Sequence, residues 1–229
     1  MEVIEGPLRE QLLATNPYIE RLKLPLQHAS IHYYERGEYI VEEGVAPSAF
    51  YFIIKGRCKI YLTHENGKAS LLNFISEGAF IGEIELLNET HVAKGVQTAT
   101  DVYCIVFPFT YYREYCLQNT TFLRELSMYL GNKAIEMGYK VSIQQAYPLE
   151  NRLAFFMLLA AQHNVYQERH TEVCDYLGVS YRHLLHTFSI FCEKGYLTKD
   201  GRTYILKNID ALNELAQALS IQKSTAANR

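Results

Sequence analysis

Turn signals recur at short, regular intervals in the first half of the chain. Between residues 26 and 108, apolar runs rich in Ile, Tyr, Phe and Val are interrupted about every ten residues. The interruptions are the Gly-containing pairs Arg36-Gly37, Glu43-Gly44, Lys55-Gly56, Asn66-Gly67 and Glu77-Gly78. Such short runs are typical of the strands of a β-sandwich or roll, and Asn66-Gly67 is the strongest hairpin signal among them. The segment YFIIKGRCKIYL is apolar enough to lie in the middle of the sheet.

The pattern changes to a helical period after Pro108. Apolar side chains now recur every three or four residues, which predicts one face of a long helix over about 119–145. That face consists of Leu123, Leu126, Leu130, Ala134, Met137 and Val141. Gly131 and Gly138 stand beside it, where small residues let a second helix approach closely. We interpret the face as a dimer interface, with packing against its own domain as the alternative. Pro148 ends the helix.

Residues 171–191, TEVCDYLGVSYRHLLHTFSIF, predict two helices around a tight turn. Thr171 can cap a first helix that runs to about Leu177, and Gly178 can end it in a left-handed conformation. Ser180 then caps a second helix of about 12 residues. We expect Leu184, Leu185, Phe188 and Phe191 on its buried face and Tyr181, Arg182, His186 and Ser189 on the other.

This order of elements is the helix-turn-helix arrangement, in which the second helix offers its first side chains to the DNA major groove. The next segment, KGYLTKDGRTYILKN, predicts two strands around Asp200-Gly201. We read these strands as a wing that brings Lys199 and Arg202 near backbone phosphates. A plain antiparallel helix pair, whose polar face meets only water, is the alternative.

Composition narrows the class of protein without deciding the partner. The chain of 229 residues has a net charge of −3, divided into about +2 over residues 151–229 and −5 before them. Its five cysteines are odd in number and include no CxxC pair, so we expect reduced thiols and no zinc ribbon. The first residues, MEVIEGPLREQLL, lack the basic and apolar regions of a signal peptide, and no apolar run spans a membrane. A cytoplasmic location is therefore expected.

Three segments in one order resemble the Crp/Fnr family of bacterial transcription regulators over essentially the whole chain. ERGEYIVEEGVAPSAFYFIIKGRCKIY and GAFIGEIELL resemble its two roll motifs, and LGVSYRHLLHTFSIFCEKGYL its recognition-helix segment. The wording LGVSYRHLL is most similar to the YeiL-like branch. The resemblance implies an α+β fold with three parts. These are a β-roll (a jelly roll of the cyclic-nucleotide-binding kind) over 1–118, a dimerisation helix over 119–147 and a winged helix-turn-helix over 148–229.

The resemblance also implies a homodimer that binds a two-fold symmetric operator and works with RNA polymerase. The recognition positions fall on Tyr181, Arg182 and His186, where many members have Arg, Glu and Arg, so the usual half-site is not carried over. We expect Arg182 to contact a guanine through both arms of its guanidinium. The full set of candidate DNA contacts is Ser180, Tyr181, Arg182, His183, His186, Lys199 and Arg202.

For an effector, the resemblance implies a ribose-binding carboxylate at the Gly-Glu pair of the second roll motif. Gly82 and Glu83 stand there, with Lys94 as a nearby cation. Ten residues after the pair Gly82-Glu83, where relatives that bind cyclic AMP have Arg-Ser, this chain has Val92-Ala93. Because an ammonium is a poor substitute for a guanidinium fork, cyclic AMP is not the expected effector. We favour Glu83 as a turn residue or surface carboxylate, and the effector, if there is one, stays unidentified.

Other kinds of site find little support in the sequence. An iron–sulfur cluster needs cysteines near the N-terminus, and none precedes Cys58; we expect buried, inert thiols rather than a redox switch. His28 and His32 lack a third metal ligand nearby, and no cupin-like HxH…E…H set can be assembled. GxSxG, P-loop and GxGxxG motifs are absent. No metal, cofactor or enzymatic activity is therefore expected, and the rival functions are a cupin-like enzyme or a roll that binds a ligand or partner without reading DNA.

Overall fold

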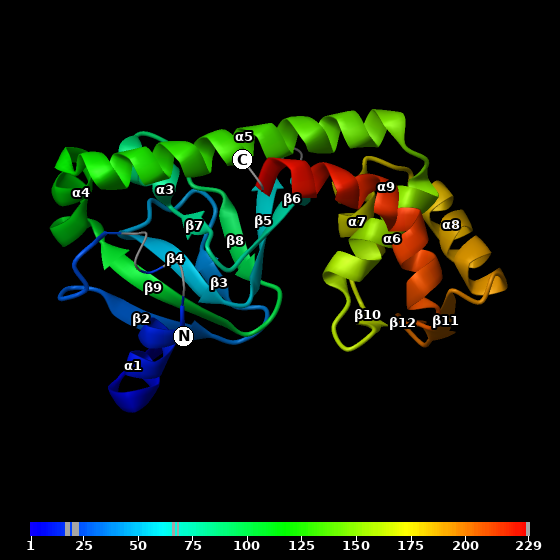
Figure 1. The fold of residues 1–229 in the computed structure, drawn as a ribbon, viewed down its shortest axis with the longest axis horizontal. Coiled ribbons are helices and arrows are strands. Elements are labelled where there is room, and N and C mark those ends of the chain that lie inside the picture. The colour runs from blue at the N-terminus through cyan, green and yellow to red at the C-terminus, as the bar shows by residue number, and fades with distance from the viewer. Residues whose placement is uncertain (17–18, 20–22, 66, 68, 228–229) are drawn as a thin grey trace. The chain divides into compact units, whose positions relative to one another are not determined.

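The computed structural model describes residues 1–16, 19, 23–65, 67 and 69–227 (Figure 1). The chain divides into two compact units, Met1–Asn132 and Lys133–Arg229. The first unit is built on two antiparallel sheets, and the second on helices with a small sheet. This mixed content confirms the predicted α+β class. Among the described residues no helix is long and apolar enough to cross a membrane.

Two sheets form the roll of the first unit. One has the strand order β1-β2-β9-β4-β7 and the other β3-β8-β5-β6, and their pairings are antiparallel. The strands are β1 (Glu2–Ile4), β2 (Ser30–Tyr34), β3 (Tyr39–Val41), β4 (Ala49–Lys55), β5 (Arg57–Thr63), β6 (Ala69–Ser76), β7 (Phe80–Ile81), β8 (Gly95–Thr98) and β9 (Val102–Pro108). Their order along the chain follows the turn signals that the sequence contains.

The segment YFIIKGRCKIYL crosses from one sheet to the other, which corrects the expectation of a single sheet. Its first half belongs to β4, between β9 and β7, and its second half to β5, between β8 and β6. The change occurs at Gly56, whose φ is +100° and where an added Cβ would lie 2.2 Å from the Asp101 carbonyl oxygen. Only glycine fits there. The predicted hairpin is present, because β5 and β6 pair from Arg57–Ser76 to Thr63–Ala69. Asn66 lies outside the described residues.

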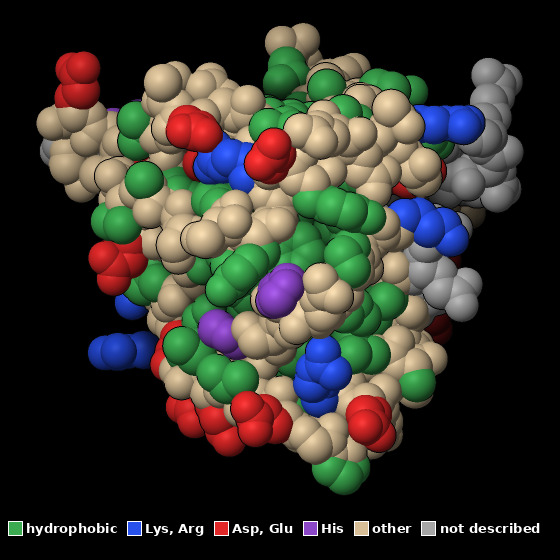
Figure 2. Space-filling model, turned by 90° about the vertical axis from the view of Figure 1, so that its left-hand side faces the viewer, with side chains coloured by type: hydrophobic (Ala, Val, Ile, Leu, Met, Phe, Trp, Pro, Cys, Tyr) green, Lys and Arg blue, Asp and Glu red, His purple; other side chains and the backbone are tan. Residues whose placement is uncertain are grey.

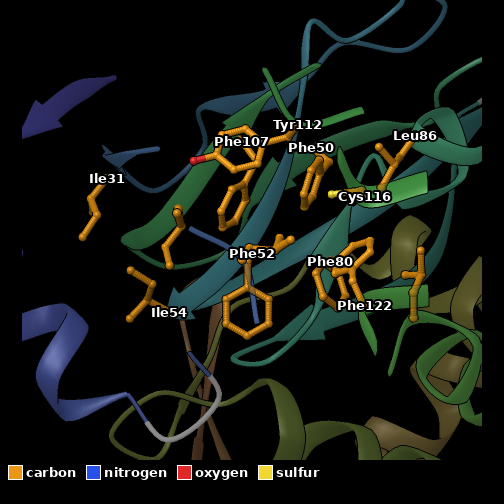
Figure 3. Packing of buried hydrophobic residues seen from close by; sticks show 13 residues of the cluster. Ile31, Phe50, Phe52, Ile54, Phe80, Leu86, Phe107, Tyr112, Cys116 and Phe122 are labelled. Atoms are coloured by element: carbon orange, nitrogen blue, oxygen red, sulfur yellow. The ribbon is translucent and has the colours of Figure 1, made fainter. Parts of the chain in front are cut away.

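The first sheet is buried on both faces, which explains the nearly continuous apolar runs in β4 and β9. Successive side chains of a strand point to opposite faces. Phe50, Phe52 and Ile54 accordingly pack on one side with aromatic residues of the helices, whereas Ile53 packs between the two sheets. The first cluster is centred on Phe50, whose ring stacks on Phe107 at 4.8 Å (Figure 3).

Helices cover the outer face of this sheet. They are α1 (Gly6–Thr15), α3 (Glu83–Leu87), α4 (Phe109–Gln118) and the long α5 (Thr120–Ala146). Tyr112 and Cys116, one turn apart on α4, and Phe122 of α5 are buried in the Phe50 cluster. Other side chains of α4 are exposed, among them Tyr111 at 58%. Figure 2 shows that hydrophobic side chains gather on this side of the molecule.

The bounds of the long helix agree with the predicted range of about 119–145 to within one residue. Some of its apolar residues are buried in the core of the roll, however, and others are exposed. Leu126 is 1% exposed and belongs to the core of the roll, so it cannot lie in a dimer interface as expected. Leu123 and Leu130 are half-buried, and Ala134, Met137 and Val141 are exposed. On the exposed side, a Cβ added at Gly131 or Gly138 would meet no atom within 4 Å. The residues Met128, Ile135 and Tyr139 are also exposed, and helical geometry places them as a second apolar row on the other side of these two glycines.

The second unit begins with the C-terminal end of α5. Pro148 precedes α6 (Leu149–Ala160), as predicted for a residue tolerated only at the start of a helix. The remaining elements are β10 (Val165–Tyr166), α7 (His170–Leu177), α8 (Tyr181–Glu193), β11 (Leu197–Asp200), β12 (Thr203–Leu206) and α9 (Ile209–Ala227). Leu153, Phe156 and Met157 on the buried face of α6 form the centre of this unit, and α6 packs along α9.

Candidate nucleic-acid interface

The helices α7 and α8 meet in a tight turn at Gly178. This glycine is left-handed, with φ +65°, and the turn closes with hydrogen bonds from Gly178 N to the Asp175 carbonyl at 3.4 Å and from Val179 N to the Cys174 carbonyl at 3.0 Å. The predicted cap Ser180 is confirmed, because its hydroxyl accepts a hydrogen bond from His183 N at 3.2 Å. The sequence therefore fixes where α8 begins.

The predicted cap at Thr171 is wrong. Helix α7 begins at His170, with Arg169 in the cap position, two residues before Thr171, and no side-chain cap. The ring of His170 stacks on Phe188 at 4.9 Å, and this contact draws residue 170 into the first turn. Thr171 is exposed within that turn.

Helix α8 has one buried and one exposed face. Leu184, Thr187, Phe188 and Phe191 are buried, a spacing of three, four and seven residues. Leu185, expected in the core, is 38% exposed instead. Thr187 takes its place because its hydroxyl donates to the His183 carbonyl within the helix at 3.1 Å. A hydroxyl satisfied in this way can be buried at little cost.

The exposed face of α8 carries the residues expected to read DNA. Tyr181, Arg182, His183 and His186 are all exposed. Ser180, Arg182, His183 and His186 also line one shallow, open hollow at the start of the helix. Across the described part of the chain, no carboxylate lies within salt-bridge distance of Arg182. Its guanidinium can therefore hydrogen-bond to an anionic or acceptor-rich partner.

A wing follows α8, as predicted. Strands β11 and β12 pair from Leu197–Leu206 to Asp200–Thr203, and Gly201 makes the two-residue loop with φ +56°. Lys199 and Arg202 are exposed near the tip. The sequence did not reveal the third strand of this sheet, β10, which pairs with β12. Two residues are too few to give a strand pattern.

An aromatic cluster joins the wing to α8. Phe188 of α8 stacks on Tyr204 of β12 at 4.4 Å, and Tyr166 of β10 lies 5.8 Å from Phe188. His170 also packs on this cluster, where burial and the nearby Lys199 lower its pKa. Sequence reasoning missed this role for His170. The cluster holds the wing and the exposed face of α8 in one rigid assembly.

Lys140, near the end of α5, packs against α7. Its ammonium lies 3.6 Å from the centre of the Tyr176 ring, which is close enough for a cation–π contact. Burial lowers the pKa of Lys140 to about 8. Burial, with a smaller contribution from the charge of Glu136, raises the pKa of Tyr176 to about 12. The contact is therefore between a cation and a neutral ring at neutral pH.

Replacing Lys140 by Met is expected to remove a pH-dependent part of the stability. Lys140 titrates at about 8 in the folded protein and near 10.4 in the unfolded chain. Between these values the unfolded state binds more protons, so Lys140 makes the free energy of unfolding rise with pH. Urea unfolding at about pH 7 and about pH 10 measures this. From about pH 7 to about pH 10, the free energy of unfolding should increase more for wild type than for Lys140→Met. The variant Lys207→Met, at an exposed lysine, should show the same pH response as wild type. The same pH response in all three would contradict the assignment.

The predicted effector residues do not form one cluster of exposed polar groups. Gly82 is left-handed with φ +82°, and an added Cβ would lie 3.1 Å from the Ala49 carbonyl oxygen. Glu83 is the first residue of α3 and only 3% exposed, so the interpretation as a surface carboxylate is wrong. It is buried because α3 turns back onto β4 at the tight Gly82. Lys94 is exposed, and Ala93 beside it is buried.

The cysteines are buried or partly buried, whereas His28 is exposed and His32 is half-buried. Cys58, Cys104, Cys116 and Cys174 are buried, as expected for inert thiols, and Cys192 is partly buried. Burial raises the pKa of Cys58 and of Cys116 to about 12. His28 stacks on Tyr111 at 4.4 Å and His32 lies 2.9 Å from the Ser30 hydroxyl. Within the described ranges, no group of three or more His, Cys, Asp or Glu side chains is placed to hold a metal ion.

Comparison with known proteins places the chain in a family. The sequence model of the cyclic nucleotide-binding domain matches residues 31–119, which is most of the roll. The regulatory protein YeiL of Escherichia coli O157:H7 is 40% identical over 179 residues, a match that covers 78% of this chain and 82% of YeiL. The chain belongs to the Crp/Fnr family of transcription regulators. Its relation to YeiL agrees with the branch expected from LGVSYRHLL.

More distant members of the Crp/Fnr family have the same fold. The cAMP-activated global transcriptional regulator CRP of Salmonella typhimurium is 25% identical over 150 residues, covering 65% of this chain and 70% of CRP. A solved structure of a Crp/Fnr-family regulator from Eubacterium rectale aligns over 93% of this chain and 98% of its own, with a TM-score of 0.71 at 12% identity. Another from Thermus thermophilus aligns over 82% and 98%, with a TM-score of 0.66 at 20% identity. The named relatives are regulators rather than enzymes.

Proposed function

We propose that this chain acts as a homodimeric regulator that reads a two-fold symmetric DNA operator in the cytoplasm. The observation that carries the proposal is the exposed face of α8, with Tyr181, Arg182 and His186 on a helix whose start is fixed by Gly178 and Ser180. In a helix-turn-helix these first exposed positions of the second helix face the base edges. Membership of a regulator family supports the same function and gives no support to a cupin-like enzyme or to a roll that does not read DNA.

The polar residues of this surface contact either the bases or the phosphate backbone of the DNA. Arg182 reads a guanine through two hydrogen bonds, and Tyr181 and His186 contact a thymine methyl group, a base edge or a phosphate. Ser180 and His183 lie at the positive end of the α8 dipole, which favours a phosphate. Lys199 and Arg202 of the wing contact the DNA backbone. Affinity through phosphates depends on such local cations, so a net charge of −3 for the whole chain is no obstacle.

The exposed side of α5 provides the dimer interface. The half-buried Leu123 and Leu130, with the exposed Ala134, Met137 and Val141, form one apolar row. Gly131 and Gly138 leave room for the backbone of a second α5 to approach. Two recognition helices brought together in this way reach successive major grooves about 34 Å apart. We assign residues 1–118, 119–147 and 148–229 the roles of sensor, dimerisation helix and DNA-binding domain.

The sensor takes an effector other than cyclic AMP, or none. Gly82, Glu83 and Lys94 remain the candidate effector residues. Val92 stands where a guanidinium would be needed to hold a cyclic phosphate, and the nearby Lys94 is exposed. RNA polymerase is the expected protein partner of the DNA-bound dimer.

A titration of a labelled random-sequence duplex with the purified protein tests the proposal. Fluorescence anisotropy should show binding at about 0.05 M salt that weakens by orders of magnitude at about 0.2 M, because each phosphate contact releases a counterion. Arg202→Ala should reduce the slope of log affinity against log salt by about 1. A protein that binds no duplex at the lower salt concentration would contradict DNA reading.

A further inference from the structure

The carbonyl groups at the end of α7 are satisfied from three different sources. The last four carbonyls of a helix have no partner within it. In α7 the carbonyls of Cys174 and Asp175 accept hydrogen bonds from the turn itself, from Val179 N and Gly178 N. The carbonyl of Tyr176 accepts from the side-chain amide of Gln144 on α5, with Nε2 at 3.0 Å. The fourth is bound by a side chain of α6.

That fourth carbonyl, of Leu177, accepts a hydrogen bond from Nη1 of Arg152. The same guanidinium donates from Nε to the carbonyl of Tyr147 at 3.1 Å, where the chain passes from α5 to α6. Burial lowers the pKa of Arg152, although the guanidinium keeps its charge at neutral pH. The rigid guanidinium of Arg152 therefore links the end of α5 to the end of α7 through two hydrogen bonds.

Gln144 also covers the turn. A Cβ added at Gly178 would lie 3.6 Å from Cδ and from Oε1 of Gln144, so the amide group sits directly on the glycine. Lys140, one helical turn earlier on α5, rests on the ring of Tyr176. Positions four apart lie on one face of a helix. That face of α5 therefore packs on the end of α7 and on the turn that begins α8.

We propose that Gln144 and Arg152 are positioning residues for DNA reading, which fix the turn before α8 to the C-terminal end of α5. This inference rests on the proposed function. Ser180, Tyr181 and Arg182 follow the turn directly, and hydrogen bonds to bases tolerate only a few tenths of an ångström in length. A turn that is free to move spreads these side chains over many positions. With Gln144 and Arg152 in place, α8 follows the end of α5 as one body.

The test compares two glutamine-to-glutamate variants of the full-length dimer. In Gln144→Glu the carboxylate cannot donate to the Tyr176 carbonyl and places a negative charge against it. Gln217→Glu makes the same chemical change at an exposed position on α9. Operator affinity is measured on a site selected by the wild-type protein, and amide hydrogen exchange is measured across residues 174–184. Melting temperature and dimer mass are recorded for both variants.

We expect Gln144→Glu to bind its operator about ten-fold more weakly, because a buried carbonyl loses its hydrogen-bond donor. Its amide hydrogens should exchange faster only around the turn. Gln217→Glu should match wild type, and both should remain folded dimers. The inference is overturned if Gln144→Glu keeps its operator affinity, even with faster exchange, because its role would then be structural only. If wild-type protein selects no operator, the proposed function fails by itself. Exchange then decides whether Gln144 fixes the turn: faster exchange supports it and unchanged exchange rejects it.

Discussion

Replacing Met137 by Glu is expected to produce a monomer that binds its operator about 100-fold more weakly or worse. Met137 is 58% exposed on the apolar side of α5, beside the open backbone at Gly138. In a dimer, two carboxylates would be buried there without partners, which costs more than the interface can supply. Without the second subunit each recognition helix binds its half-site alone. In a dimer, binding of one half-site raises the effective concentration of the second recognition helix at the other half-site. Losing this effect lowers the operator affinity by about 10²–10⁴-fold.

Analytical ultracentrifugation and an operator titration measure both parts of this prediction. Met137→Leu keeps the apolar surface and should remain a dimer with wild-type affinity. Circular dichroism should show that Met137→Glu is still folded, because Met137 lies outside the buried clusters of the roll. A Met137→Glu protein that stays dimeric and binds tightly would show that the dimer uses another surface.

Replacing Arg182 by Ala is expected to weaken operator binding about 10- to 100-fold and to remove the preference for one base pair in each half-site. Arg182 is exposed at the start of α8, and a bidentate Arg–guanine contact contributes about 1–3 kcal/mol of discrimination. Arg182→Lys keeps the charge and loses the fork, so non-specific affinity should persist while the base preference falls.

The wing provides the matched comparison for this prediction. Arg202→Ala removes an exposed arginine that we assign to the DNA backbone. It should weaken binding to all sequences by a similar factor and leave the preferred site unchanged. Competition binding against a panel of operators, each altered at one position, measures both variants. Our assignment of Arg182 would be wrong if its replacement also weakened all sequences equally.

Local signals in the sequence predicted the elements of this fold more reliably than their packing. Gly178 and Ser180 determine the turn and the start of α8 through backbone conformation and a single cap, which are local effects. The surface that a side chain faces depends on distant parts of the chain. Leu126 shares a helical stripe with Met137, yet it is buried because the aromatic cluster of the roll lies against that end of α5.

The same reason explains the other differences. Both halves of YFIIKGRCKIYL are rich in apolar residues, and nothing in this pattern shows that they join different sheets. The close approach of Asp101 to Gly56, where the chain changes sheets, exists only in the folded chain. Thr187 is polar, and its burial depends on a hydrogen bond to its own helix. Gln144 and Arg152 belong to no sequence motif that would indicate their role. Their role follows from the two carbonyls they bind at the end of α7, an arrangement that only the folded chain creates.

Selection of binding sites from a random DNA pool tests the central claim most directly. The purified protein, at about 0.1 M salt and without added ligand, should enrich a two-fold symmetric site whose half-sites lie about one helical turn apart. Each half-site should contain a guanine whose preference disappears with Arg182→Ala. A pool that shows no enrichment, even when cell extract supplies small molecules, would contradict DNA reading by α8.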